Sequence, residues 1–167
     1  MNFSNRICQT LHEEHVATVT LLERLQQLLI NRRNSGPPNT SDLTVARLLT
    51  DLASGLGREI DRHFAFEENH LFTYLAEMGN SGIGAQLTAE HRVILPLGTR
   101  VAEIARAVAG RAFTPAEWDE FVRSGRALAD NLIPHAQKED MALLPMIEAN
   151  MDQETEAHLH QEYLETI

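Results

Sequence analysis

His63-Phe-Ala-Phe-Glu67-Glu-Asn-His-Leu-Phe is the stretch from which the rest of the fold can be worked out. A histidine and a glutamate four residues apart lie on the same side of a helix, one turn above the other. A second such pair follows in His135-Ala-Gln-Lys-Glu139-Asp-Met-Ala-Leu-Leu-Pro. One pair alone is a weak signal, but two pairs inside apolar helical segments indicate a shared site. Imidazole and carboxylate together suit a metal ion such as iron, zinc or manganese.

Four segments of the chain repeat apolar residues at three- and four-residue spacings, which predicts four amphipathic helices. Aromatic residues make up 5% of the chain and β-branched residues do not alternate in runs, so strands are not expected. Four long helices joined by short loops pack most simply as an all-α, antiparallel up-down four-helix bundle. The predicted helices cover about residues 4–31, 41–78, 83–109 and 114–150.

The ends of these helices carry recognisable signals. Asp42, or the serine before it, can cap the second helix. Thr114 begins the fourth helix, and Glu117 three residues later completes a capping box. Pro134 and Pro145 lie on either side of the second His-x-x-x-Glu pair, so the fourth helix is predicted to bend near that pair.

Length and composition narrow the class of protein. The bundle is expected over residues 1–151 as one domain, followed by an acidic segment, 152–167, that forms a tail or a short helix. The net charge of −10 argues against a general nucleic-acid-binding surface. No apolar run approaches the roughly 20 residues that cross a bilayer. The single cysteine, Cys8, excludes an internal disulfide and fits a reducing compartment, so a cytoplasmic protein is expected.

Two further histidines complete the candidate site. At 1.5 Å per residue, His15, Glu67 and Glu139 lie roughly 17, 18 and 17 Å from one end of the bundle. His91 lies roughly 12 Å from that end. A buried layer of imidazoles and carboxylates at one level is unfavourable unless a cation lies between them. The predicted metal ligands are His15, His63, Glu67, His91, His135 and Glu139.

This number of ligands indicates two metal ions. A structural zinc site takes four ligands, usually including thiolate. Six ligands suit two ions that are bridged by the two carboxylates, with two imidazoles and open coordination positions on each ion. Mixed nitrogen and oxygen ligation with open positions favours iron. Glu14 and Glu90 precede two of the histidines, and each either accepts a hydrogen bond from a ligand imidazole or belongs to a solvated face.

The remaining chemically notable residues are expected outside the ligand set. His70 would extend Glu67 to a Glu-x-x-His motif, but the fourth helix has no second copy of that motif. His12 is expected to face away from His15, towards the surface. Cys8 is expected to be a small core residue and Tyr74 a core aromatic residue, while the histidines of the acidic tail are expected to be solvated.

The order His, His-x-x-x-Glu, His, His-x-x-x-Glu across four helices resembles the hemerythrin-like (HHE cation-binding) domain family. Flanking residues match as well: Glu-His at 14–15 and 90–91, Glu-Glu-x-x-Leu-Phe at 67–72, and Leu-Leu-Pro at 143–145. The resemblance covers about residues 8–148. It implies a non-haem di-iron centre, with two iron ions per chain joined by an oxo or hydroxo bridge, inside a four-helix bundle.

The sequence departs from the oxygen-carrying hemerythrins at two positions. They have a second histidine four residues after the one in the third helix, and Leu95 stands there in this chain. They also bridge the irons through an aspartate five residues after the histidine of the fourth helix. Asp140 has that spacing, but Glu139 lies on the same face as His135 and is expected to be the bridge. One missing imidazole leaves one more open position, which disfavours simple oxygen carriage.

The expected function is a carboxylate-bridged di-iron protein that binds, senses or reduces a small molecule: dioxygen, nitric oxide or peroxide. The expected partners are that small molecule and, if the protein oligomerises, a second copy in a homodimer, with neither nucleic acid nor membrane. Two alternatives stay open at this point. One is an iron-responsive sensor or store, and the other is a helical interaction module without turnover.

Overall fold

The computed structural model describes residues 2–167, apart from the side chains of residues 58 and 59. The regular structure of this part consists of α-helices and two π-helical turns, and it contains no strand, as predicted. The elements in chain order are α1 (Arg6–Asn31), α2 (Leu43–Phe66), η1 (Glu67–Leu71, a π-helical turn), α3 (Phe72–Glu77), α4 (Ser81–Ala107), α5 (Pro115–Lys138), η2 (Glu139–Leu143, the second π-helical turn), α6 (Leu144–Asn150) and α7 (Gln153–Leu164).

Side-chain caps fix where the long helices begin. Asn5 accepts hydrogen bonds from two backbone N–H groups of the first turn of α1, so this helix begins slightly later than predicted. Asp42 caps α2 in the same way. The predicted capping box of α5 is confirmed, because Thr114 and Glu117 each accept a hydrogen bond from the backbone N–H of the other.

Two of the predicted helices are interrupted by a π-helical turn. The second predicted helix divides into α2, η1 and α3, and the fourth divides into α5, η2 and α6. Each π turn begins at the glutamate of a His-x-x-x-Glu pair, Glu67 in η1 and Glu139 in η2. The bend predicted between Pro134 and Pro145 therefore corresponds to a π turn, which adds one residue to the helical turn that carries the site.

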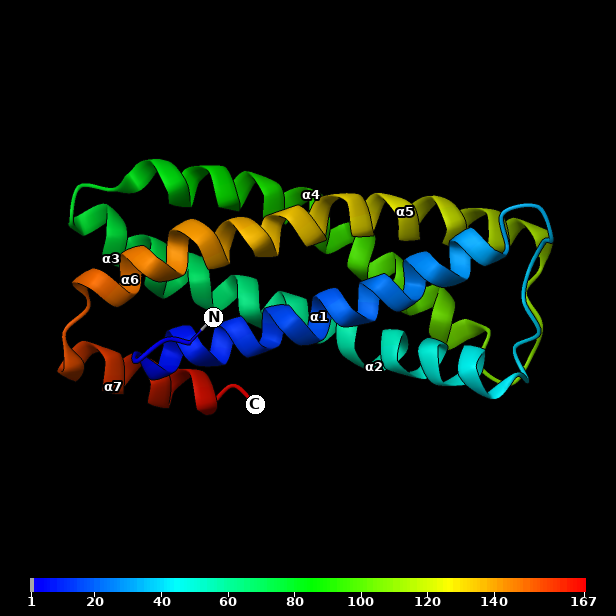
Figure 1. The fold of residues 1–167 in the computed structure, drawn as a ribbon, viewed down its shortest axis with the longest axis horizontal. Coiled ribbons are helices and arrows are strands. Elements are labelled where there is room, and N and C mark those ends of the chain that lie inside the picture. The colour runs from blue at the N-terminus through cyan, green and yellow to red at the C-terminus, as the bar shows by residue number, and fades with distance from the viewer. Residues whose placement is uncertain (1) are drawn as a thin grey trace.

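The long helices pack as an antiparallel bundle (Figure 1). Helix α1 contacts α2 and α5, and α4 contacts the same two helices from the other side. Helix α7 doubles back and lies beside the N-terminal half of α1 (Figure 1). Helix α7 packs on the bundle through two buried residues four positions apart, Leu159 and Tyr163. Among the helices of the described residues, none is both long and apolar enough to cross a membrane.

The core is divided into two apolar clusters by a polar layer. The larger cluster fills the end of the bundle near the loop between α1 and α2 and includes Leu25, Leu52 and Phe121. The smaller cluster fills the other end and includes Leu11, Leu75 and the residues that anchor α7. On every long helix the predicted ligands lie between residues of the two clusters. The fold therefore places these polar side chains at one level, with apolar packing above and below.

Candidate metal centre

The six predicted ligands all lie in this layer, and each is at most 7% exposed. They come from four neighbouring parts of the bundle: α1, α2 with η1, α4, and α5 with η2. They form two overlapping groups, and within each group the ligand atoms lie within 4.8 Å of one another. The first group is His15, His63, Glu67 and Glu139, and the second is Glu67, His91, His135 and Glu139.

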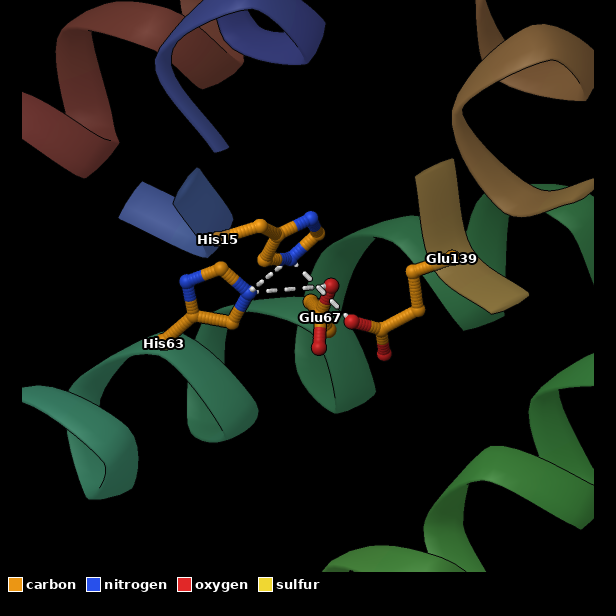
Figure 2. Close-up of side chains that lie close together, drawn as sticks. All are labelled: His15, His63, Glu67 and Glu139. Atoms are coloured by element: carbon orange, nitrogen blue, oxygen red, sulfur yellow. Dashed lines mark hydrogen bonds and ion pairs between the residues drawn. The ribbon is translucent and has the colours of Figure 1, made fainter. Parts of the chain in front are cut away.

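The two glutamates belong to both groups because each turns one oxygen towards each histidine pair. Glu67 Oε1 lies 3.3 Å from His63 Nε2, and Glu67 Oε2 lies 3.4 Å from His91 Nε2. Glu139 Oε2 lies 3.1 Å from His15 Nε2, and Glu139 Oε1 lies 2.9 Å from His135 Nε2. This geometry is that of two carboxylates between two cation positions. Figure 2 shows the side chains of the first group converging on one point.

Several of these buried atoms make no hydrogen bond of acceptable geometry among the described residues, although an opposing nitrogen or oxygen lies within 3.4 Å of each. They are both carboxylate oxygens of Glu67, Oε1 of Glu139, and Nε2 of His91 and of His135. Burying such atoms without a partner is unfavourable, so each one calls for an explanation. A pair of metal ions would supply it, because each of these five atoms is a nitrogen or oxygen of a type that binds metal and faces the centre of the layer. The residues present therefore fit a two-metal site.

Each of the four histidines is oriented by a carboxylate on its other ring nitrogen. His15 Nδ1 lies 2.7 Å from Asp140 Oδ1, and the Nδ1 atoms of the other three histidines each lie 2.8 Å from a carboxylate oxygen. A carboxylate at Nδ1 holds the proton there and leaves Nε2 free to bind a metal. We call these four residues the outer carboxylates: Glu14 at His63, Glu68 at His91, Glu90 at His135 and Asp140 at His15.

The two halves of the chain build the site by the same scheme. In the first half, Glu14 stands just before His15 and orients His63. In the second half, Glu90 stands just before His91 and orients His135. Glu68 follows Glu67 and orients His91 of the second half. Asp140 follows Glu139 and orients His15 of the first half. The pairing scheme is unchanged when the two halves are exchanged. The internal repeat therefore extends beyond the doubled His-x-x-x-Glu pair that the sequence predicts.

Cationic groups lie against the outer carboxylates. Arg62 Nη2 donates to Glu14 at 2.7 Å, and the Lys138 ammonium donates to Glu90. His12 Nδ1 lies 2.9 Å from the second oxygen of Asp140. The prediction that His12 faces away from the site is wrong, because Asp140 offers one oxygen to His15 and the other to His12.

The electrostatics of the layer favour positive charge at its centre. Burial alone lowers the pKa of a histidine, but the surrounding carboxylates outweigh it and raise the pKa of His15 to about 9, of His63 to about 10 and of His91 to about 9. Burial alone raises the pKa of Glu139, yet the neighbouring imidazoles of His135, His15 and His91 hold this pKa well below its ordinary value. Both shifts indicate that protons or metal ions are strongly stabilised between Glu67 and Glu139.

Tyr163 of α7 is a residue of the site that the sequence analysis missed. Its hydroxyl donates to Glu14 Oε2 at 2.5 Å, and its ring lies under the guanidinium of Arg62, 4.7 Å from Cζ. Burial and the Glu14 carboxylate raise the pKa of Tyr163, so the hydroxyl keeps its proton. The C-terminal helix is thereby connected to His63 through Glu14. In the sequence, the four-residue spacing from Leu159 to Tyr163 is the only signal of this contact.

Aromatic rings cover the other half of the site. The ring of Phe64 stacks on His91 at 3.7 Å between centroids, and Phe72 lies 5.7 Å away from the same imidazole. Leu71 and Ile94 are buried. Leu95 is half-buried and packs against the larger apolar cluster.

The other residues singled out in the sequence lie outside both ligand groups. His70 lies 3.5 Å from Glu162 of α7. Cys8 is buried in the smaller cluster, as predicted, and burial raises the pKa of its thiol to about 12. Tyr74 is half-buried and donates to the backbone carbonyl of Asn150. In the tail, His158 is exposed, whereas His160 is half-buried against α1.

Comparison with models of known protein families gave a match to the hemerythrin HHE cation-binding domain. The match covers residues 6–147, and a further match to the same family covers residues 82–165. The first range contains all six clustered histidines and glutamates. Neither the curated proteins nor the solved structures gave a match.

Proposed function

Because the chain belongs to the hemerythrin HHE cation-binding domain family, we propose that it is a non-haem di-iron protein. The observation that carries this proposal is the orientation of two carboxylates. Glu67 and Glu139 each turn one oxygen towards the His15–His63 pair and the other towards the His91–His135 pair. His15 and His63 would hold one iron and His91 and His135 the other, and Glu67 and Glu139 would contribute to both.

We propose further that the centre binds, senses or reduces dioxygen, nitric oxide or peroxide. Iron supplies the redox chemistry and the open coordination positions for such a ligand. The side chains supply the rest. The outer carboxylates contact each Nδ1 and aim each Nε2 at the centre, and the apolar rings and aliphatic side chains around His91 limit the access of water.

The test is an anaerobic titration of the purified chain with ferrous iron, followed by metal analysis and optical spectra. Two irons per chain are expected, and exposure to oxygen should produce the near-ultraviolet charge-transfer bands of a ferric pair. Nitric oxide and hydrogen peroxide are then added to separate samples, and their consumption is measured. A chain that binds no iron under these conditions would contradict the proposal.

Two substitutions separate the site from its surroundings. His63→Ala removes one proposed ligand and should lower the iron content. His70→Ala removes a histidine of the same segment that lies outside both ligand groups and should leave the iron content unchanged. Equal iron content in the two variants would mean that the layer does not hold the metal.

A role as an iron-responsive sensor is the second candidate, and the docking of α7 favours it. Tyr163 connects this helix to His63 through Glu14, and a sensor would use this connection to couple occupancy of the site to attachment of α7. A sensor predicts that iron increases the protection of α7 from hydrogen exchange, without consumption of peroxide or nitric oxide. Equal protection of α7 with and without iron would exclude this role.

A further inference from the structure

A cavity of about 510 Å³ lies beside the candidate metal centre, between α1, α2 and α5. Its inner end is lined by His15, His63, His135 and Glu139, which belong to the two ligand groups. Its exposed rim is formed by Thr20 of α1 and Ser54 of α2. We propose that this cavity binds an uncharged, mainly apolar organic molecule directly next to the metal centre.

The volume of the cavity is the first argument for an organic ligand. One water molecule takes up about 30 Å³ in the liquid, and a diatomic molecule is of similar size. A cavity of about 510 Å³ is far larger than such a ligand needs. It falls within the range of roughly 300–1,000 Å³ that is typical of sites for small organic molecules.

The pairing of charges on the walls is the second argument, and it indicates that the ligand is uncharged. Arg24 of α1 forms an ion pair with Asp51 of α2 at 2.7 Å, so this cation and anion of the rim neutralise each other. Arg62 is paired with Glu14 at 2.7 Å in the same way. An ionic ligand would have to compete with these pairs and lose its hydration, which is unfavourable.

The rest of the wall indicates an apolar ligand. Between the rim and the metal centre, the cavity is lined chiefly by aliphatic and aromatic side chains, including Leu21, Leu56, Ile60, Phe64 and Leu132. Burial of apolar surface against such a wall is the main favourable contribution to binding of an uncharged organic molecule. The hydroxyls of Thr20 and Ser54 donate to backbone carbonyls of their own helices, so they do not offer free donors to a polar ligand.

The arrangement of α7 leaves this side of the site accessible. On the stretch of α1 before the site, Arg6 and Glu14 contact Glu156 and Tyr163 of α7. Glu14 also lines the inner part of the cavity, and Arg24, beyond the site, lines it and forms its ion pair with α2 rather than with α7. The inference rests on the proposed function only for the role of the irons, because the cavity itself is built from protein side chains.

The binding test uses two fluorescent probes with the same ring skeleton. N-phenyl-1-naphthylamine is uncharged, and 1-anilinonaphthalene-8-sulfonate adds one sulfonate group. Each probe is titrated against the full chain, with and without iron, and fluorescence is recorded. Saturable binding of one uncharged probe per chain is expected, with binding of the sulfonate at least tenfold weaker. The absence of saturable binding, or equal binding of the two probes, overturns the inference.

Cavity-filling variants locate the bound probe. Ala17 lines the cavity on an exposed stretch of α1, and Ala17→Trp should weaken binding of the uncharged probe at least tenfold. Ser54→Trp fills the cavity from α2 and should have the same effect, which guards against a folding defect in either variant. Val16→Trp is the matched control, because Val16 is 52% exposed and does not line the cavity. Unchanged binding in both filled variants overturns the inference.

The outcomes separate this inference from the proposed function. If the chain binds the uncharged probe but no iron, the proposed ligand site in the cavity is supported and the di-iron proposal is refuted. If the chain binds iron but not the probe, the di-iron proposal is supported and the proposed ligand site is refuted. When both bind, the probe should shift the charge-transfer bands of the iron-loaded chain, and Ala17→Trp should abolish that shift.

Discussion

At the scale of single residues, the site is a layer of buried histidines and glutamates whose histidines are oriented by the outer carboxylates. Orientation of His63 depends on Glu14, which in turn accepts hydrogen bonds from Arg62 and Tyr163. Outer partners of this kind typically change metal affinity by about 10–100-fold when they are removed. Because Tyr163 acts on the metal ligand through Glu14, it is a positioning residue, and its effect should lie at the lower end of that range.

Tyr163→Phe should therefore weaken iron binding by about tenfold, while the apolar packing of the ring is kept. The measurement is competition for ferrous iron with a chelator of known affinity. Tyr74→Phe is the matched control, since it removes a hydroxyl that donates to a backbone carbonyl away from the site. If the two variants bind iron equally well, the hydrogen bond from Tyr163 to Glu14 has no effect on the centre.

The sequence predicted the six inward-facing residues because each lies in register with the apolar stripe of its own helix. It also suggested Glu14 and Glu90, which stand next to ligand histidines along the chain. The roles of Glu68 and Asp140 could not be predicted in this way, because each orients a histidine from the other half of the molecule. Contacts between helices depend on the rotation of both helices, and helical spacing constrains only one of them.

At the scale of helices, close approach of α3 and α4 supports the His91 side of the site. A Cβ atom at Gly84 would lie 2.9 Å from Cβ of Phe72, which is too short for a contact between carbon atoms. Phe72 in turn packs beside His91. The absence of a side chain at Gly84 therefore allows α4 to approach the segment that covers one imidazole of the centre.

Gly84→Ala should destabilise the chain by about 1–3 kcal/mol, since α4 or Phe72 must move to relieve the overlap. Gly82→Ala is a matched control in the same helix, because a Cβ there meets no atom within 4 Å. It should leave stability unchanged or raise it by up to about 1 kcal/mol through better helix propensity. Urea unfolding of both variants measures these changes, and equal stability of the two would refute the close-packing argument.

The sequence predicted the long helices and their caps from periodicity and from Asp42, Thr114 and Glu117. It did not predict the π turns, for a physical reason. Buried residues keep three- and four-residue spacings through a π turn, as Glu139, Leu143 and Ile147 do, so the pattern reads as a continuous helix. Helix α7 was expected only as a tail or short helix, because two buried residues, Leu159 and Tyr163, carry its packing.

At the scale of the whole molecule, protons and metal ions compete for the same layer. The pKa of His15, His63 and His91 is raised from 6.5 to about 9 or 10 in the folded chain. A raised pKa contributes stability that is fully present below the ordinary value and is lost as pH rises through the folded value. Metal binding removes this dependence, because a metal-bound imidazole carries no exchangeable proton on that nitrogen.

The metal-free chain should therefore melt at progressively lower temperature as pH rises from 6.5 to 10. The iron-loaded chain should melt at a higher temperature throughout and change much less over the same window. Circular dichroism melts at half-unit pH steps measure both curves. A melting temperature of the metal-free chain that increases with pH would show that the histidines are not protonated in the folded state.

The pairing scheme shared by the two halves meets unequal surroundings. Tyr163 and Arg62 lie beside Glu14 and His63 of the first half, whereas Phe64 and Phe72 lie against His91 of the second, and the cavity reaches three of the four histidines. Two irons bound in this layer would have the same set of ligand types but different electrostatic surroundings. A single electron added to the ferric pair should then be trapped on one ion, and Mössbauer spectra of that mixed-valence form should resolve separate ferrous and ferric signals.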